Sequence, residues 1–488
     1  MLDYCKDIMI GSNTMDNTGL KIAVVADLHY YSPSLGTTGT AYELRSAQDQ
    51  KCLAESGAII DSAFESIKKS GADCVLIAGD LANNGERICH EEVFEKISDL
   101  NKSIPAYTVY ATHDWCCDND AKRFEGDNVF HYDDTLTPPE LKELYAPFGR
   151  NRAESEYVTH LEASSYSLNI GKNIRLIATN DDQNGKGASG YTDEHLDWIL
   201  SECKKAKANG EYIILMQHHM LVNSISEIIS KSQHIGDNIE VANKLADAGV
   251  SLVICGHSHM QRTTRFVSDN GNTLYQLNQG ALCGYPAPIT YLEINGGEMK
   301  ISVESLKEFE YNGKTETLDY IKKHTQNVIF ALLEYAAGDR DKFFKLLENN
   351  GISTDSIKNI YPIISKCAHY ALTATVGKAG RLLNALTFGK GVNKKAVEKI
   401  SDDYLIDYIA DLFLSVFDGS EKTYAPSDPV YDIVTDVASL PRRAVNILPA
   451  KQLKDGKVMS VLLEIEKIAH ELLVPSKPDN HHFTFTMQ

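Results

Sequence analysis

Histidine and aspartate residues recur directly after short apolar runs in the first 260 residues of the chain. Imidazole and carboxylate ligands together favour Mn, Fe or Zn, whereas Mg and Ca prefer oxygen ligands alone. In an extended backbone, residues two positions apart point to the same side, so Asp-x-His and His-x-His each present two donors together. Five such blocks predict a metal site. Their residues are Asp27 and His29, then Asp80, then His113, then His218 and His219, and finally His257 and His259.

Each block needs an element that delivers its side chains to one place. The preceding apolar runs have the length and composition of strands, and ligands of open α/β sheets bind beyond the carboxyl ends of the strands. Leu53, Ile60, Phe64 and Ile67 recur at helical spacing between the first two runs, which predicts a covering helix. This alternation predicts a layered α/β fold with a partly parallel sheet. The candidate strands are 21–26, 73–79, 106–111, 174–179, 212–217 and 251–256, followed by hairpin strands at 272–278, 289–294 and 299–305.

The pattern becomes helical after about residue 310. One helix is predicted around Leu318 and Leu332 and ends at Gly338, and another begins with Ser401 as its N-cap. We therefore expect a first domain over residues 1–308 and an all-α C-terminal domain over 309–488. The second domain is expected to act as a lid, a substrate wall or an interaction module.

Composition restricts the partners. The chain has 488 residues, is 43% hydrophobic and 24% charged, and carries a formal net charge of −19. The excess of acid lies in the first 310 residues, because 22 Lys+Arg balance 22 Asp+Glu in the remainder. An acidic surface repels phosphate backbones, so we expect no long nucleic acid as a partner. The sequence does not indicate an oligomeric state.

Membrane and disulfide signals are both missing from the sequence. No run reaches the roughly 18 apolar residues that a membrane span needs, and the stretch 370–391 is interrupted by Lys378 and Arg381. We expect this stretch to be a buried helical segment and the protein to have no membrane partner. The ten cysteines show no C-x-x-C spacing. Free thiols in a reducing compartment, and hence a cytoplasmic location, are the simplest interpretation.

The order of the blocks resembles that of a known family. The series D-x-H, G-D-x-x-N-N-G-E, H-D, H-H and G-H-x-H over about residues 20–300 resembles the calcineurin-like metallophosphoesterases. The stretches GDLANNGE, HHMLV and QGALCGYP resemble the bacterial branch related to class III cyclic-nucleotide phosphodiesterases. The resemblance implies an α/β/β/α sandwich, two divalent metal ions (Mn, Fe or Zn) and a small phosphate-ester substrate.

The same resemblance assigns roles to individual residues. It implies a first metal held by Asp27, His29, Asp80 and His259. The second metal would be held by Asp80, His218, His257 and the residue before His113, so that Asp80 bridges the pair. Two such ions activate water and clamp the phosphate oxygens during in-line displacement. The remaining assignments are His113 as general acid or as a hydrogen-bonding neighbour of the site, Asn84 as a phosphate ligand or a turn residue, and His219 as a substrate contact or an outward spacer.

Thr112 departs from the family pattern. The family has Gly-Asn-His at this position, and its Asn amide oxygen binds the second metal, whereas this chain has Ala111, Thr112 and His113. A threonine hydroxyl is shorter than the amide side chain and is a poorer donor. Thr112 therefore binds the metal directly, holds a water that binds it, or leaves the position to solvent. In each case the departure affects the affinity of the second site more than the fold.

Three functions are compatible with these residues. The first is a binuclear metal-dependent phosphoesterase that hydrolyses a small phosphodiester, possibly a cyclic nucleotide, by metal-hydroxide attack. The second is a phosphomonoesterase of the same fold. The third is a non-catalytic metal-binding protein with a degenerate second site, which only Thr112 supports.

Overall fold

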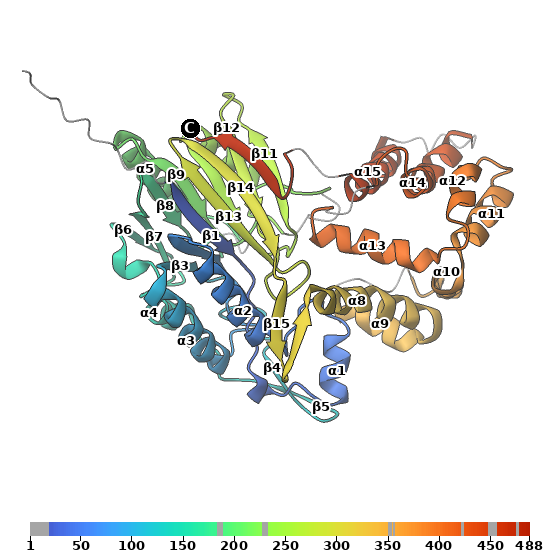
Figure 1. Ribbon diagram of the computed structural model, residues 1–488, viewed down its shortest axis with the longest axis horizontal. Coiled ribbons are helices and arrows are strands. Elements are labelled where there is room, and N and C mark those ends of the chain that lie inside the picture. Colours follow the sequence, from blue (N-terminus) through green and yellow to red (C-terminus); the bar gives the residue numbers. More distant parts are fainter. Residues whose placement is uncertain are drawn as a thin grey trace, which may run out of the picture.

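Two β-sheets stack face to face in the computed structural model (Figure 1). The structure describes residues 19–182, 189–226, 233–349, 354, 357–420, 424–447, 456–474 and 478–488. The first sheet has the order β17 (His482–Thr486), β14 (Glu298–Ser305), β13 (Pro288–Asn295), β1 (Leu20–Val25), β2 (Cys74–Ala78) and β3 (Ala106–Val109). The second has the order β11 (Arg262–Val267), β12 (Thr273–Asn278), β10 (Val250–Cys255), β9 (Tyr212–Met216), β8 (Ile174–Ala178), β7 (Ser164–Asn169) and β6 (Ser155–Val158).

Alternating side chains of the strands form separate cores on the two faces of each sheet. Along β1, Ile22 and Val24 belong to the cluster between the sheets, while Ala23 and Val25 pack under helices. The first sheet is covered by α2 (Ser56–Lys69), α3 (Arg87–Ser103) and α4 (Pro138–Leu144). The second is covered by α5 (Asp193–Ala208) and α7 (Asn238–Asp247). The expected α/β/β/α sandwich is confirmed.

The predicted strands are found where the apolar runs lie. β1, β2 and β3 pair in parallel, as do β8, β9 and β10, so their carboxyl ends share one edge of the sandwich. β13 and β14 form an antiparallel hairpin whose turn contains Gly296 and Gly297, both with positive φ. Such a two-residue turn favours glycine because it matches the twist of the strands. Smaller elements are α1 (Thr40–Ser46), β4 (Lys122–Glu125), β5 (Asn128–His131), β15 (Glu308–Tyr311) and β16 (Lys314–Thr317).

Helices of the C-terminal part gather at one side of the sandwich (Figure 1). The expected helix that ends at Gly338 is confirmed as α8. The placement of the N-cap at Ser401 is wrong, because α13 begins at Leu405 with Tyr404 as N-cap. The carbonyls of Ser401 and Asp403 instead accept hydrogen bonds from the start of α11. The helices are α8 (Leu318–Gly338), α9 (Arg340–Asn349), α10 (Tyr361–Thr373), α11 (Val376–Leu386), α12 (Lys394–Lys399), α13 (Leu405–Phe417), α14 (Pro429–Ile447) and α15 (Gly456–Leu473).

The end of the chain returns to the sandwich, which the sequence analysis did not anticipate. β17 pairs antiparallel with β14, with Phe485 opposite Met299. Phe485 and Met487 then fill the core between the sheets. The all-α description therefore applies to α8–α15 and not to the last residues of the chain.

The stretch 370–391 is helical but not buried throughout, so that part of the expectation is wrong. Leu386 is 68% exposed and Phe388 is 95% exposed. Among the residues that the structure describes, no helix combines the length and apolar character that a membrane crossing requires.

Candidate metal centre

Strained backbone marks the ends of β1, β2 and β10. Asp27, His29 and Asp80 have φ values of 52°, 39° and 50°, and His257 and His259 have values of 67° and 60°. Residues with a Cβ rarely adopt this left-handed region. Such strain costs on the order of 1–3 kcal/mol per residue and is concentrated at functional sites. Five strained residues with potential ligand atoms lie at one edge of the sandwich. Their strained backbone indicates that these loops direct their side chains toward one point.

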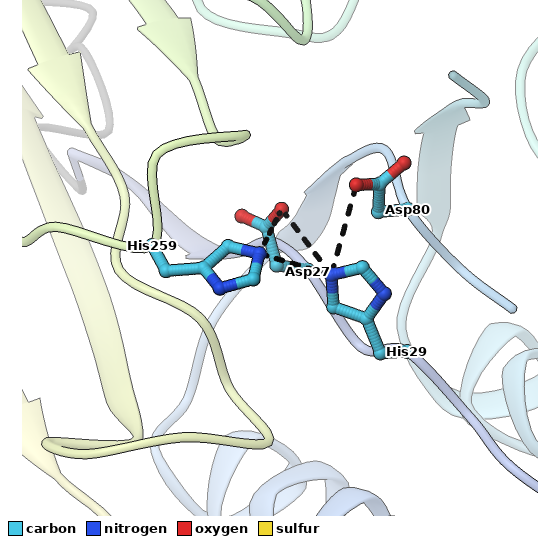
Figure 2. Close-up of side chains that lie close together, drawn as sticks. All are labelled: Asp27, His29, Asp80 and His259. Atoms are coloured by element: carbon cyan, nitrogen blue, oxygen red, sulfur yellow. Dashed lines mark hydrogen bonds and ion pairs between the residues drawn. The ribbon is translucent and has the colours of Figure 1, made fainter. Parts of the chain in front are cut away.

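The first cluster consists of Asp27, His29, Asp80 and His259, whose ligand atoms lie within 4.8 Å of one another (Figure 2). Nε2 of His29 lies 3.0 Å from Nε2 of His259 and 3.6 Å from Oδ2 of Asp80. Nε2 of His259 lies 3.5 Å from Oδ1 of Asp27. Two imidazoles and two carboxylates thus point at one small volume.

A second cluster shares Asp80 with the first and adds His218 and His257. Nδ1 of His218 donates a hydrogen bond to the carbonyl of Ala78 at 2.8 Å, which leaves Nε2 free to bind a metal. That Nε2 lies 3.1 Å from Oδ2 of Asp80. Asp80 therefore contacts both clusters, as a bridging carboxylate must.

Without a cation, burial and neighbouring charges shift the pKa values of the ionisable groups in this site. Burial, helped by the Asp80 carboxylate, raises the pKa of Asp27 to about 8. Burial also lowers the pKa of His29 and His257 well below the usual value. For His218 burial acts in the same direction, but Asp80 outweighs it and holds the pKa well above the usual value.

Several buried polar atoms have no hydrogen-bond partner among the described residues. They include Oδ2 of Asp27 and Oδ1 of Asp80. Unpartnered buried polar atoms are costly unless something else satisfies them. Two divalent cations would satisfy these atoms and cancel the carboxylate charge, so the residues present fit the implied metal pair.

Two glycines allow the loops to approach this closely. A Cβ at Gly79 would lie 2.5 Å from Nδ1 of His218, and one at Gly256 would lie 2.5 Å from Oδ2 of Asp27. Contacts of this length would displace the donors. The glycines before Asp80 and His257 are therefore part of the site.

Gln50 contacts the first cluster and was not predicted. Its amide nitrogen lies 2.5 Å from Nδ1 of His259, while its Oε1 is buried without a partner. A nitrogen that donates to Nδ1 would force the ring proton onto Nε2 and prevent Nε2 from binding a metal. With the amide reversed, Oε1 accepts from Nδ1–H and Nε2 is free. Side-chain amide orientation is assigned from such networks, and the reversed orientation suits a metal ligand.

Two buried aspartates hold the loops and were also not predicted. Asp114 accepts hydrogen bonds from the backbone N–H groups of Leu81, Ala82 and Ala111, at 2.8–2.9 Å. It thereby fixes the loop after Asp80 against the loop that carries His113. Asp181 accepts from the backbone N–H groups of His218 and His219. In both cases the available sequence signal was an acidic residue shortly after an apolar run.

The remaining candidate residues surround the two clusters. The His113 ring lies 5.1 Å from that of His29, and its Nδ1 lies 2.5 Å from Oδ1 of Asn84. Asn84 also donates to the carbonyl of Asp120, so the contacts it makes position His113. His219 contacts Ser189 through Nε2 at 2.9 Å. Thr112 is half-buried, and its hydroxyl makes no hydrogen bond to the described residues.

Comparison with known protein families finds a match in the first half of the chain. A family model described as calcineurin-like phosphoesterase matches residues 20–261. No curated protein sequence matches the chain.

Three solved structures show weak similarity to the fold. A dimetal phosphatase from Danio rerio is 12% identical with a TM-score of 0.42, covering 61% of this chain and 99% of that one. A purple acid phosphatase from yellow lupin is 13% identical with a TM-score of 0.40, covering 62% and 53%. The NAD nucleotidase of Haemophilus influenzae is 13% identical with a TM-score of 0.33, covering 74% and 62%. At these TM-scores the similarities identify neither a substrate nor a branch of the family.

Proposed function

Because residues 20–261 belong to the calcineurin-like phosphoesterase family, we propose that this protein is a metal-dependent hydrolase of a small phosphate ester. The observation that carries the proposal is the position of Asp80 in both clusters, where its buried Oδ2 lies 3.1 Å from Nε2 of His218 and 3.6 Å from Nε2 of His29. A carboxylate in this position joins two metal sites. We assign the first metal to Asp27, His29, Asp80 and His259, and the second to Asp80, His218, His257 and the position of Thr112.

The chain's own residues have separate tasks in this reaction. Bound cations supply charge that stabilises the phosphoryl oxygens and activates water. His113 delivers a proton to the leaving oxygen, held in orientation by Asn84 through Nδ1. Asp114 keeps the two loops in register, and Asn84 and His219 remain candidates for contact with the substrate.

The finer assignment is a phosphodiester, with a cyclic nucleotide as one candidate and a phosphomonoester as the alternative. Its support is the resemblance of GDLANNGE, HHMLV and QGALCGYP to one branch of the family. A cytoplasmic location is supported by the nine cysteines of the described residues, all of which are unpaired.

We assign the helices after about residue 309 to a wall of the substrate site. Two contacts support this assignment. In the first, α8 reaches the loop before α2, where Tyr320 donates to Glu55 at 2.6 Å. In the second, the buried Arg262, three residues after His259, donates to the carbonyl of Ser415 in α13 at 2.7 Å. The helices thus contact the loop before α2 and the first residue of β11, close in the chain to Gln50 and His259 respectively.

A hydrolysis screen tests the proposal. Purified protein would be loaded separately with Mn, Fe, Zn and Ni and offered phosphomonoesters, phosphodiesters and cyclic nucleotides. We expect turnover that disappears in Asp80→Ala. A wild type that binds two metals and hydrolyses none of these esters would instead support the non-catalytic metal-binding alternative.

A further inference from the structure

A buried lysine lies in the loop between α1 and α2. Lys51 is 6% exposed, although lysines are almost never buried unless they are paired with an opposite charge. The only ion pair that it forms with the described residues is with Oδ2 of Asp49, at 3.6 Å. This distance is beyond the range of a hydrogen bond.

Asp49 is already satisfied by other groups. Nη2 of Arg45 lies 2.6 Å from the same Oδ2, and Oδ1 accepts the backbone N–H of Lys51 at 3.0 Å. Arg45 and Asp49 therefore neutralise each other as a close pair. The side-chain nitrogen of Lys51 makes no hydrogen bond to the residues that the structure describes.

The loop places this charge beside the first cluster. The preceding residue, Gln50, contacts His259 at 2.5 Å. The following residue, Cys52, donates its backbone N–H to the carbonyl of Cys283 at 2.7 Å. Leu282, the neighbour of Cys283, in turn donates its backbone N–H to the carbonyl of Ala26 at 3.0 Å, directly before Asp27. Lys51 thus lies between a residue that contacts the candidate ligand His259 and a residue that pairs with the loop beside Asp27.

Helix α8 of the C-terminal part contacts the chain on both sides of Lys51. His324 of α8 contacts the carbonyl of Asp49 at 3.0 Å, and Tyr320 of the same helix donates to Glu55 at 2.6 Å. A lysine side chain loses about 2 kcal/mol of conformational entropy when it is fixed. The burial of Lys51 already restricts its side chain, so less of this freedom remains to be lost when a ligand binds.

An ammonium at this position opposes the binding of cations, because like charges repel in a buried site. The same field attracts an anion that enters next to the metals. We propose that Lys51 forms an anion-binding subsite beside the first cluster, where its ammonium binds a phosphate oxygen of the substrate. The proposal rests on the proposed function of the metal centre and adds a third source of positive charge to it.

Binding of inorganic phosphate to the metal-loaded protein tests the subsite without relying on turnover. Isothermal titration would compare wild type, Lys51→Met and Lys51→Arg, with metal affinity measured on the same preparations. The matched control is Lys21→Met, because Lys21 donates to the carbonyl of Ser70 at 2.8 Å and is not near the clusters. Lys51→Gln replaces the methionine variant if that protein does not fold.

The affinity for phosphate should fall while the affinity for metal does not. Loss of a charge-assisted hydrogen bond should weaken phosphate binding by about 10- to 100-fold in Lys51→Met. Metal affinity should be unchanged or tighter, since a repelling charge is removed. Lys51→Arg should retain most of the phosphate affinity, and Lys21→Met should resemble wild type.

Two results would overturn the subsite. One is phosphate affinity in Lys51→Met within twofold of wild type. The other is an equal loss of phosphate and metal affinity, which would show general damage to the site. Failure of the proposed function is distinguishable, because wild type would then hydrolyse no ester while the phosphate titrations still report on Lys51.

Discussion

Replacing Gln50 with methionine preserves the length of the side chain but removes the amide that lies 2.5 Å from Nδ1 of His259. In the reversed orientation, the lost group is the acceptor that keeps the ring proton on Nδ1 and leaves Nε2 for the first metal. A buried hydrogen bond to such a polarised group contributes about 1.5–3 kcal/mol. That range corresponds to about 10- to 150-fold in affinity, in line with the 10- to 100-fold effects typical of groups that orient metal ligands.

Glutamate at the same position separates the two amide orientations. A carboxylate accepts from Nδ1–H but cannot donate, so Gln50→Glu should keep or increase the affinity of the first site, while Gln50→Met loses it. Competition with a chromophoric chelator would give the affinities for Mn or Zn, with Gln48→Met as the control from the same loop. Equal affinities in wild type and Gln50→Met would refute a positioning role. A loss in Gln50→Glu as large as in Gln50→Met would show that the amide donates.

The other predictions concern separate residues. Thr112→Asn should restore the amide ligand and raise the affinity of the second site by about 10- to 100-fold, and unchanged metal titration curves would make threonine a full substitute. His113→Ala should reduce turnover of esters with poor leaving groups by about 10²- to 10⁴-fold with metal content preserved, and unaltered turnover would remove His113 from the mechanism. Burial lowers the pKa of His195 to about 4, so the unfolded chain binds the extra proton first and stability falls as the pH drops below about 6.5. His195→Phe should cancel about 2 kcal/mol of the loss between pH 7 and pH 5 in denaturant titrations, and an unchanged pH dependence would contradict this assignment.

The sequence located the strands and most of the residues that cluster beyond their carboxyl ends because their signals are local. Asp27 and Asp80 each follow an apolar run within a few residues, and parallel pairing of β1 with β2 then brings them to one edge. The same logic located His218 and the pair at 257 and 259. These predictions needed only strand periodicity and the rule that ligands bind beyond the carboxyl ends of strands.

Long-range contacts could not be predicted in this way. Gln50 and His259 are 209 positions apart, and nothing near Gln50 in the sequence indicates that its amide reaches a histidine. β17 is a five-residue strand whose partner, β14, lies far earlier in the chain. The start of α13 was misplaced for a related reason, since backbone hydrogen bonds to α11 occupy the carbonyls of Ser401 and Asp403.

The central claim is that Asp80 joins two metal sites at the shared edge of the two sheets. Elemental analysis of protein dialysed after loading with Mn or Zn measures this most directly. We expect two ions per chain in wild type and none in Asp80→Ala, because the variant loses a ligand of both sites and the carboxylate that joins them. Asp80→Ala that still holds two ions per chain would contradict the account.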